Sequence, residues 1–109
     1  VARAEQDYIE ARQEVAESDV DVAEQEVRTA RARLDLVKQR QLVRIGKEPL
    51  ASLKGFEKAI ETQEAKGKQK RASSVDLRSR AQARLDAWKA AQESYASQTG
   101  DFDSGVWIE

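Results

Sequence analysis

The sequence predicts an all-α fold, a long antiparallel hairpin of two helices that resembles a coiled coil. Three observations predict it. The 109 residues include one proline and five glycines, too few for the repeated turns of a β fold. Apolar residues recur at helical spacing along both halves of the chain. The charged residues alternate in blocks whose order suits two helices that run in opposite directions.

Composition limits the chain to one small domain and excludes several kinds of site. Charged residues make up 36% of the chain, aromatic residues 6%, and the mean hydropathy is -0.77. Such a chain has little apolar material for a globule but enough for paired helices. It contains no cysteine and no histidine, which removes disulfides, thiolate metal sites and imidazole catalysis. No stretch is long and apolar enough to predict a membrane span.

The first helix is expected over residues 1–45, where no proline or glycine interrupts the chain. Two stripes of apolar residues run along it and together make a face wide enough to bury against another helix. The first stripe consists of Ala2, Ile9, Ala16, Val20, Ala23, Val27, Ala30, Leu34 and Val37, and the second of Val1, Tyr8, Val15, Val22, Leu36 and Val43. Two interpretations stay open: the stripes bury the hairpin seam alone, or part of their width recruits a further helix from a second copy or another protein.

A turn is expected at residues 46–49, followed by a second helical arm over about 50–98. Gly46 suits the left-handed position after a helix end, and Pro49 is tolerated near the first turn of the next helix. The expected seam of the second arm consists of Leu53, Phe56, Ile60, Gln63, Gly67, Lys70, Ser74, Leu77, Ala81, Leu85, Trp88, Ala91 or Gln92, and Tyr95. Gly67 is the weak point of this pattern. A break there, with Ser73 or Ser74 capping a third helix, is the alternative three-helix arrangement.

The charge blocks and the apolar pattern predict one antiparallel register. Residues 1–27 carry nine acidic and two basic side chains, whereas residues 66–89 carry eight basic and two acidic ones. A hairpin folded near residue 47 brings these two blocks together, and it brings the basic residues 28–47 near Glu57, Glu61 and Glu64. The same register places Val20 opposite Val75, Leu34 opposite Glu61 and next to Ile60, Leu42 opposite Leu53, and Tyr8 beside Trp88.

The sequence offers poor parts for catalysis or ligand binding, and we expect neither enzymatic activity nor a cofactor. Its serines have no histidine to activate them, and paired carboxylates lack a desolvated pocket in a thin hairpin. Gly46 and Gly67 are single glycines outside a phosphate-binding frame. The spacing of Asp101, Asp103 and Gly105 is similar to the start of a calcium loop but lacks its later ligands, so a turn is the better interpretation and no metal is expected.

A basic stretch at residues 66–80 supports an alternative function. Clustered lysine and arginine neutralise phosphates, so this segment could bind nucleic acid or an anionic surface. The segment lacks aromatic residues for base stacking, and the predicted register places it opposite Asp19, Asp21, Glu24 and Glu26. Internal neutralisation is therefore preferred and nucleic acid is not the expected partner. The residues of this alternative site are Lys66, Lys68, Lys70, Arg71, Arg78 and Arg80.

The acidic, aromatic segment at residues 99–109 is expected to form a short non-helical tail after Gly100. In one interpretation it folds back over the open end of the hairpin, where Tyr8, Ile9, Leu85 and Trp88 lie. In the other it is a docking peptide that inserts its tryptophan into a groove of a partner. The candidate partner-binding residues are Phe102, Val106, Trp107 and Ile108.

The Ala, Glu, Gln and Arg texture of the first helix is similar to that of α-helical hairpins in bacterial envelope adaptors and in small secretion-system or periplasmic proteins. The resemblance implies a role in an envelope or secretion assembly. The turn RIGKEP lacks the W-x-G turn of the secreted hairpins of similar length, and no residue role follows from the resemblance. The first residue is Val1, so we expect an upstream segment to have been removed. The sequence thus predicts a scaffold or interaction module whose partner is another protein or a second copy.

Overall fold

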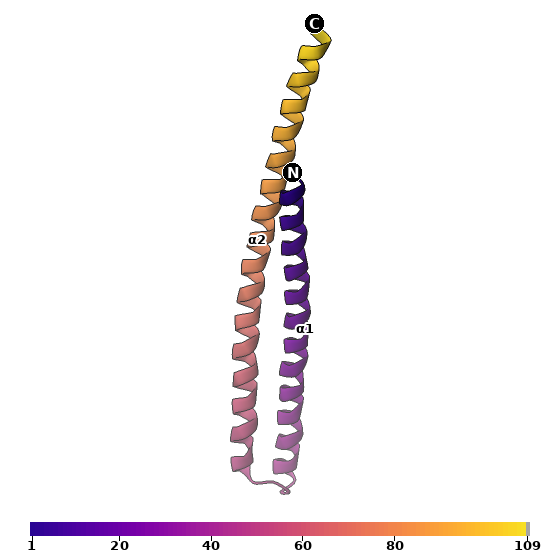
Figure 1. The fold of residues 1–109 in the computed structure, drawn as a ribbon. Helices are drawn as coiled ribbons and strands as arrows, with labels where there is room; N and C mark the ends of the chain where they lie inside the picture. The colour runs from indigo at the N-terminus through magenta and orange to yellow at the C-terminus, as the bar shows by residue number, and fades with distance from the viewer. Residues whose placement is uncertain (109) are drawn as a thin grey trace. The chain divides into compact units, whose positions relative to one another are not determined.

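The computed structural model describes the backbone of residues 1–108 and the side chains of residues 1–97. Helix α1 spans Ala2–Arg44, a short 3-10 helix η1 spans Leu50–Ser52, and helix α2 spans Leu53–Ile108 (Figure 1). No strand occurs within the described backbone. The all-α helical hairpin predicted from the sequence is therefore confirmed. The chain divides into two compact units, Glu17–Ser74 and Val1–Ala16 with the chain from Val75 onward, and each is described by itself.

The turn between the helices forms as the glycine and proline predict. Gly46 has a φ of 79°, in the left-handed region, and donates its N–H to the carbonyl of Val43 at 3.1 Å. Lys47 donates to the carbonyl of Leu42 at 2.9 Å, which completes the paired hydrogen bonds of a Schellman motif. Pro49 then precedes η1 with an extended backbone. The carbonyls of Leu42 and Val43 near the end of α1 thereby accept hydrogen bonds as the chain reverses.

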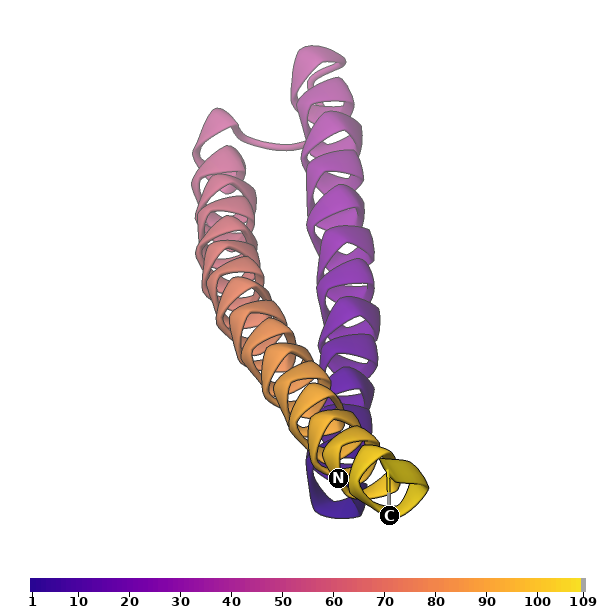
Figure 2. The ribbon, with the colours of Figure 1, turned by 90° about the horizontal axis from the view of Figure 1, so that it is seen from above.

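In the unit Glu17–Ser74 the two helices run side by side in opposite directions (Figure 1; Figure 2). Cross-helix contacts set their register. Lys70 Nζ lies 2.9 Å from Asp21 Oδ1, Arg33 lies 3.1 Å from Glu64, and the Gln39 amide donates to Ser52 Oγ at 2.8 Å. The two ion pairs match the predicted opposition of acidic and basic blocks. Each ion pair is partly exposed, so it contributes at most about 1 kcal/mol and mainly fixes orientation.

In the unit that holds the N-terminal residues, α1 and α2 are joined by an aromatic contact. The rings of Tyr8 and Trp88 stack with centroids 5.6 Å apart and planes at 28°. Arg84 lies 3.8 Å from Asp7 on the same pair of helices. The predicted neighbours Tyr8 and Trp88 are therefore confirmed.

The predicted seam of α2 is confirmed, with one exception. Its residues from Leu53 to Ala91 are buried or half-buried at three- and four-residue steps, whereas Tyr95 is 63% exposed. Helix α2 passes through Gly67 without a break, so the structure has two long helices rather than the three-helix alternative. A glycine lowers helix stability by about 1 kcal/mol but leaves the backbone hydrogen bonds intact, so a long helix tolerates it.

The seam of α1 differs from the sequence prediction. The first stripe, which was expected to lie in the seam opposite residues such as Val75, is exposed along its whole length, and Val75 is exposed as well. The buried side belongs to the second stripe, completed by small and polar residues that the apolar pattern does not include. This seam consists of Tyr8, Ala11, Val15, Ser18, Val22, Gln25, Thr29, Ala32, Leu36, Gln39 and Val43, at alternating steps of four and three. Val20, Val75 and Leu34 therefore lie outside the seam, in which the prediction had placed them.

The predicted helix end at Gly100 was also wrong. The backbone of α2 continues as a helix to Ile108, so the segment is neither a non-helical tail nor folded back along the hairpin. The sequence has no proline after Pro49 to stop the helix, and glycine alone stops a helix only when it adopts the left-handed conformation seen at Gly46.

Candidate interaction surfaces

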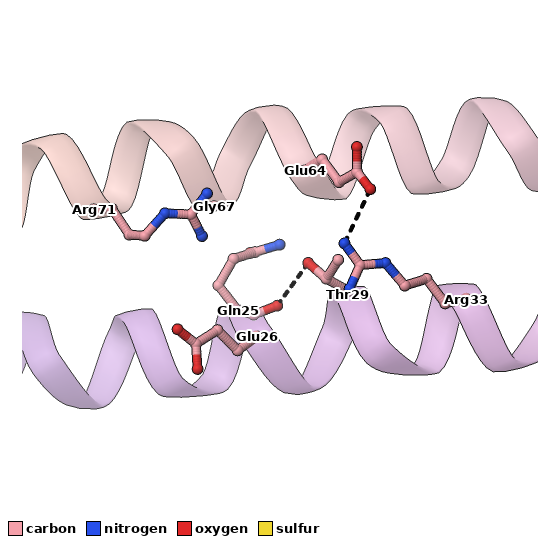
Figure 3. Close-up of a pocket in the computed structure, with 7 residues that line it drawn as sticks. All are labelled: Gln25, Glu26, Thr29, Arg33, Glu64, Gly67 and Arg71. Carbon is pink, nitrogen blue, oxygen red and sulfur yellow. Dashed lines mark hydrogen bonds and ion pairs between the residues drawn. The ribbon is translucent and has the colours of Figure 1, made fainter.

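The seam of the unit Glu17–Ser74 contains a polar layer at its centre. Gln25 is 1% exposed, and its side-chain amide donates to the Gln63 side-chain oxygen at 2.7 Å and to the Gln63 carbonyl at 3.1 Å. The buried hydroxyl of Thr29 donates to the carbonyl of Gln25 at 3.0 Å. The side-chain oxygen of Gln25 is buried and accepts no hydrogen bond. Figure 3 shows Gln25 projecting from α1 toward α2 in this layer.

A cleft of about 300 Å³ opens beside this polar layer (Figure 3). Its lining is mixed and carries both charges, with the Arg33–Glu64 ion pair at one end and Arg71 at the other. The residues around it are Gln25, Glu26, Thr29, Arg33, Glu64, Gly67 and Arg71. A ligand site is usually mostly apolar with a few placed polar groups, whereas this cleft is a gap between polar side chains on two helices. It is better explained as part of the seam than as a binding site.

The most unusual surface is the exposed apolar side of α1, here called the outer face. Val20, Val27, Leu34 and Val37 are 58%, 51%, 52% and 58% exposed. With the small residues between them they form a stripe at heptad spacing within the unit Glu17–Ser74: Val20, Ala23, Val27, Ala30, Leu34 and Val37. At 3.6 residues per turn the outer face lies about 150° around α1 from the seam, so α2 does not cover it.

Helix α2 has no comparable second stripe among the residues whose side chains are described. Its large exposed apolar residues are Val75 and Tyr95, which lie far apart in sequence. Scattered exposed apolar residues are normal on a protein surface, whereas a continuous apolar stripe at heptad spacing is typical of helices that pair. The sequence contained a signal for this arrangement, because both stripes of α1 keep a heptad repeat and one hairpin partner can cover only one of them.

The structure places the alternative basic site partly within the hairpin. Lys70 is in the seam and pairs with Asp21, and Arg71 lines the cleft beside Gln25 and Glu26. Arg80 lies with Asp7, Glu10 and Glu14 around a second small cleft in the N-terminal unit. Lys66 and Lys68 are exposed on α2. Lys70, Arg71 and Arg80 therefore lie beside acidic side chains of α1, each within its own unit.

The side chains of the candidate tail residues Phe102, Val106, Trp107 and Ile108 lie outside the described part of the chain, as do those of Asp101 and Asp103. Their role as a partner-binding segment stays a prediction. Within the described residues, neither helix contains a stretch apolar enough to cross a membrane.

No protein-family model, no curated protein and no solved structure matches this chain. The role in an envelope or secretion assembly therefore stays a prediction, based on the amino-acid composition of the first helix.

Proposed function

We propose that this protein is a non-enzymatic interaction module that uses the outer face of α1 to bind a helix of another protein chain. The single observation that supports the proposal is the exposure of Val20, Val27, Leu34 and Val37 at heptad spacing on the side of α1 away from α2. Leaving such a stripe in water costs roughly 25 cal/mol for each Å² of apolar surface, and a helical partner would remove that cost.

Composition supports the non-enzymatic part of the proposal. Without histidine or cysteine the chain lacks the residues that most often act as base or nucleophile near neutral pH. The C-terminal residues Phe102, Val106, Trp107 and Ile108 are proposed as a second contact, because aromatic residues are enriched where proteins bind each other.

Site-specific photo-cross-linking tests the proposal. A photoreactive phenylalanine analogue at Val27 should form covalent adducts with protein in an extract of the source organism, whether the adduct is another protein or a second copy. The same analogue at Val75 is the matched control, because Val75 is also exposed but lies on α2 outside the outer face. Equal labelling from both positions, or no adduct from Val27, would contradict the proposal.

A further inference from the structure

The residues that flank the outer face carry opposite charges in its two halves. On one flank Glu17 and Glu24 are followed, at heptad steps, by Arg31 and Lys38. On the other flank Asp19 and Glu26 are followed by Arg33 and Arg40. All of these side chains are exposed and all lie on α1 within the unit Glu17–Ser74. The apolar stripe is thus bordered by acids in its first half and by bases in its second half.

This distribution of charge indicates which kind of partner helix the outer face can bind. A second copy of α1 that runs antiparallel places the acidic half of each helix against the basic half of the other. A parallel copy instead brings like charges together at both ends of the stripe, Asp19 with Glu24 and Arg33 with Lys38, which is unfavourable in a coiled coil. The chain is therefore complementary to itself in one orientation only.

We propose that two copies of this chain pair through the outer faces of α1 in an antiparallel arrangement, with the two-fold axis midway between Val27 and Ala30. This inference rests on the proposed function, and it identifies the partner of the outer face as a second copy of the chain. In this register Val20 of one copy packs near Val37 of the other, and Ala23 near Leu34. The flanking pairs across the interface are Glu17 with Lys38, Glu24 with Arg31, Asp19 with Arg40, and Glu26 with Arg33.

The small residues of the stripe suit this packing. In the two central layers a large residue of one copy lies over a small residue of the other, Leu34 over Ala23 and Val27 over Ala30, whereas Val20 meets Val37 in the outer layer. Pairing a large with a small residue lets two helices approach closely and fills the layer without overlap. Arg33 also contacts Glu64 within its own chain at 3.1 Å, and a guanidinium has enough donors to serve both carboxylates.

Disulfide trapping with paired single-cysteine variants tests both the pairing and its direction. The chain has no native cysteine, so Val20→Cys and Val37→Cys each introduce one thiol. In the antiparallel register, mixing the two variants under oxidising conditions should give a disulfide-linked pair, whereas either variant alone should give little. At 1.5 Å per residue, two copies of the same thiol lie roughly 25 Å apart in this register. Self-linking of each variant alone would show a parallel pair, and no linked product in any mixture would show no pair; either result overturns the proposal.

Sedimentation of charge variants gives a second readout. Glu24→Arg should weaken self-association about tenfold or more, because two like-charged contacts replace two favourable ones. Adding Arg31→Glu to the same chain should restore it, since the pairs are then exchanged; in a parallel pair Glu24→Arg alone would not weaken association, because it removes the repulsion between Asp19 and Glu24. Val75→Glu on α2 serves as the control and should leave the sedimentation unchanged. A wild-type monomer across micromolar concentrations would overturn the proposal, and photo-cross-linking from Val27 to a different protein would still support the proposed function.

Discussion

Gly67 lies at a position where replacement by alanine is expected to make the fold more stable. It is buried in the seam of α2, and a Cβ there would lie 3.2 Å from an Arg71 side-chain nitrogen and 3.7 Å from the Gln25 side chain. The close neighbour is the far end of a flexible side chain, which can move aside. We therefore expect Gly67→Ala to stabilise the fold by about 0.5–1 kcal/mol through helix propensity.

Urea unfolding followed by circular dichroism measures this change. Gly55→Ala is the matched control, because nothing lies within 4 Å of the Cβ it would add in the same helix. A gain at position 55 with a loss of more than about 1 kcal/mol at position 67 would show that Arg71 is fixed in place.

The polar layer at Gln25 gives the second prediction. The buried amide makes two hydrogen bonds to Gln63 but leaves its own oxygen without a donor. We expect Gln25→Ala to destabilise the fold by about 1–3 kcal/mol, because it opens space in the seam and leaves Gln63 unpaired. Replacing both partners, as Gln25→Leu with Gln63→Leu, should recover at least the wild-type stability. Thermal unfolding of the three proteins separates these outcomes, and a neutral Gln25→Ala would show that the layer contributes nothing.

For individual residues, the sequence predicted the turn residues and the aromatic contact better than it predicted which polar residues are buried. Gly46, Pro49 and the contact of Tyr8 with Trp88 follow from local rules or from a register of two helices. The burial of Gln25 and Thr29 does not, because a hydrophobicity pattern assigns polar residues to the surface. Only the partner helix, with Gln63 and Gly67 at the same level, makes room for them.

Among the structural elements, the turn depends on a conformation that glycine adopts at little cost. The Gly46 φ of 79° is strained for other residues, although nothing lies within 4 Å of a Cβ added there. We expect Gly46→Ala to destabilise the hairpin by about 1 kcal/mol, since the cost is conformational rather than steric. Gly46→Asn should cost less, because asparagine tolerates the left-handed region. Denaturant midpoints of the two variants check the order, and equal losses would contradict the conformational explanation.

The sequence predicted both helices, but it predicted the buried face of α2 better than the buried face of α1. Helix α2 has one apolar stripe, and its seam followed from the sequence. Helix α1 has two stripes at the same spacing, and the sequence alone does not say which of them meets α2. Which stripe of α1 packs against α2 depends on side-chain size and polarity. The seam of α2 contains Gly67, Lys70 and Ser74, and these residues match the small and polar residues of the α1 seam better than the apolar residues of the outer face. The C-terminal end of α2 was missed because glycine weakens a helix without necessarily ending it.

At the scale of the whole molecule, the alternating charges argue against strong binding to nucleic acid. The formal net charge is -1, and Lys70 faces Asp21 within the fold. We expect no measurable binding of a labelled oligonucleotide at about 0.15 M salt, where nonspecific contacts are weak. Fluorescence anisotropy checks this, with Lys66→Glu and Lys68→Glu as variants that leave the Lys70 ion pair intact. Salt-sensitive binding that both variants reduce would instead favour the basic site.

The proposed antiparallel pair makes the stability of the whole molecule depend on its concentration. If two chains unfold together, each tenfold rise in concentration favours the folded pair by about 1.4 kcal/mol, so the melting temperature should rise with concentration. Val27→Glu places a charge in the middle of the outer face and should remove this dependence while the helical circular dichroism persists at low temperature. Val75→Glu should keep the dependence, because Val75 lies outside the outer face on α2. A melting temperature that is constant over a hundredfold range of wild-type concentration would mean that the hairpin folds as a monomer. The partner of the outer face would then be a different protein.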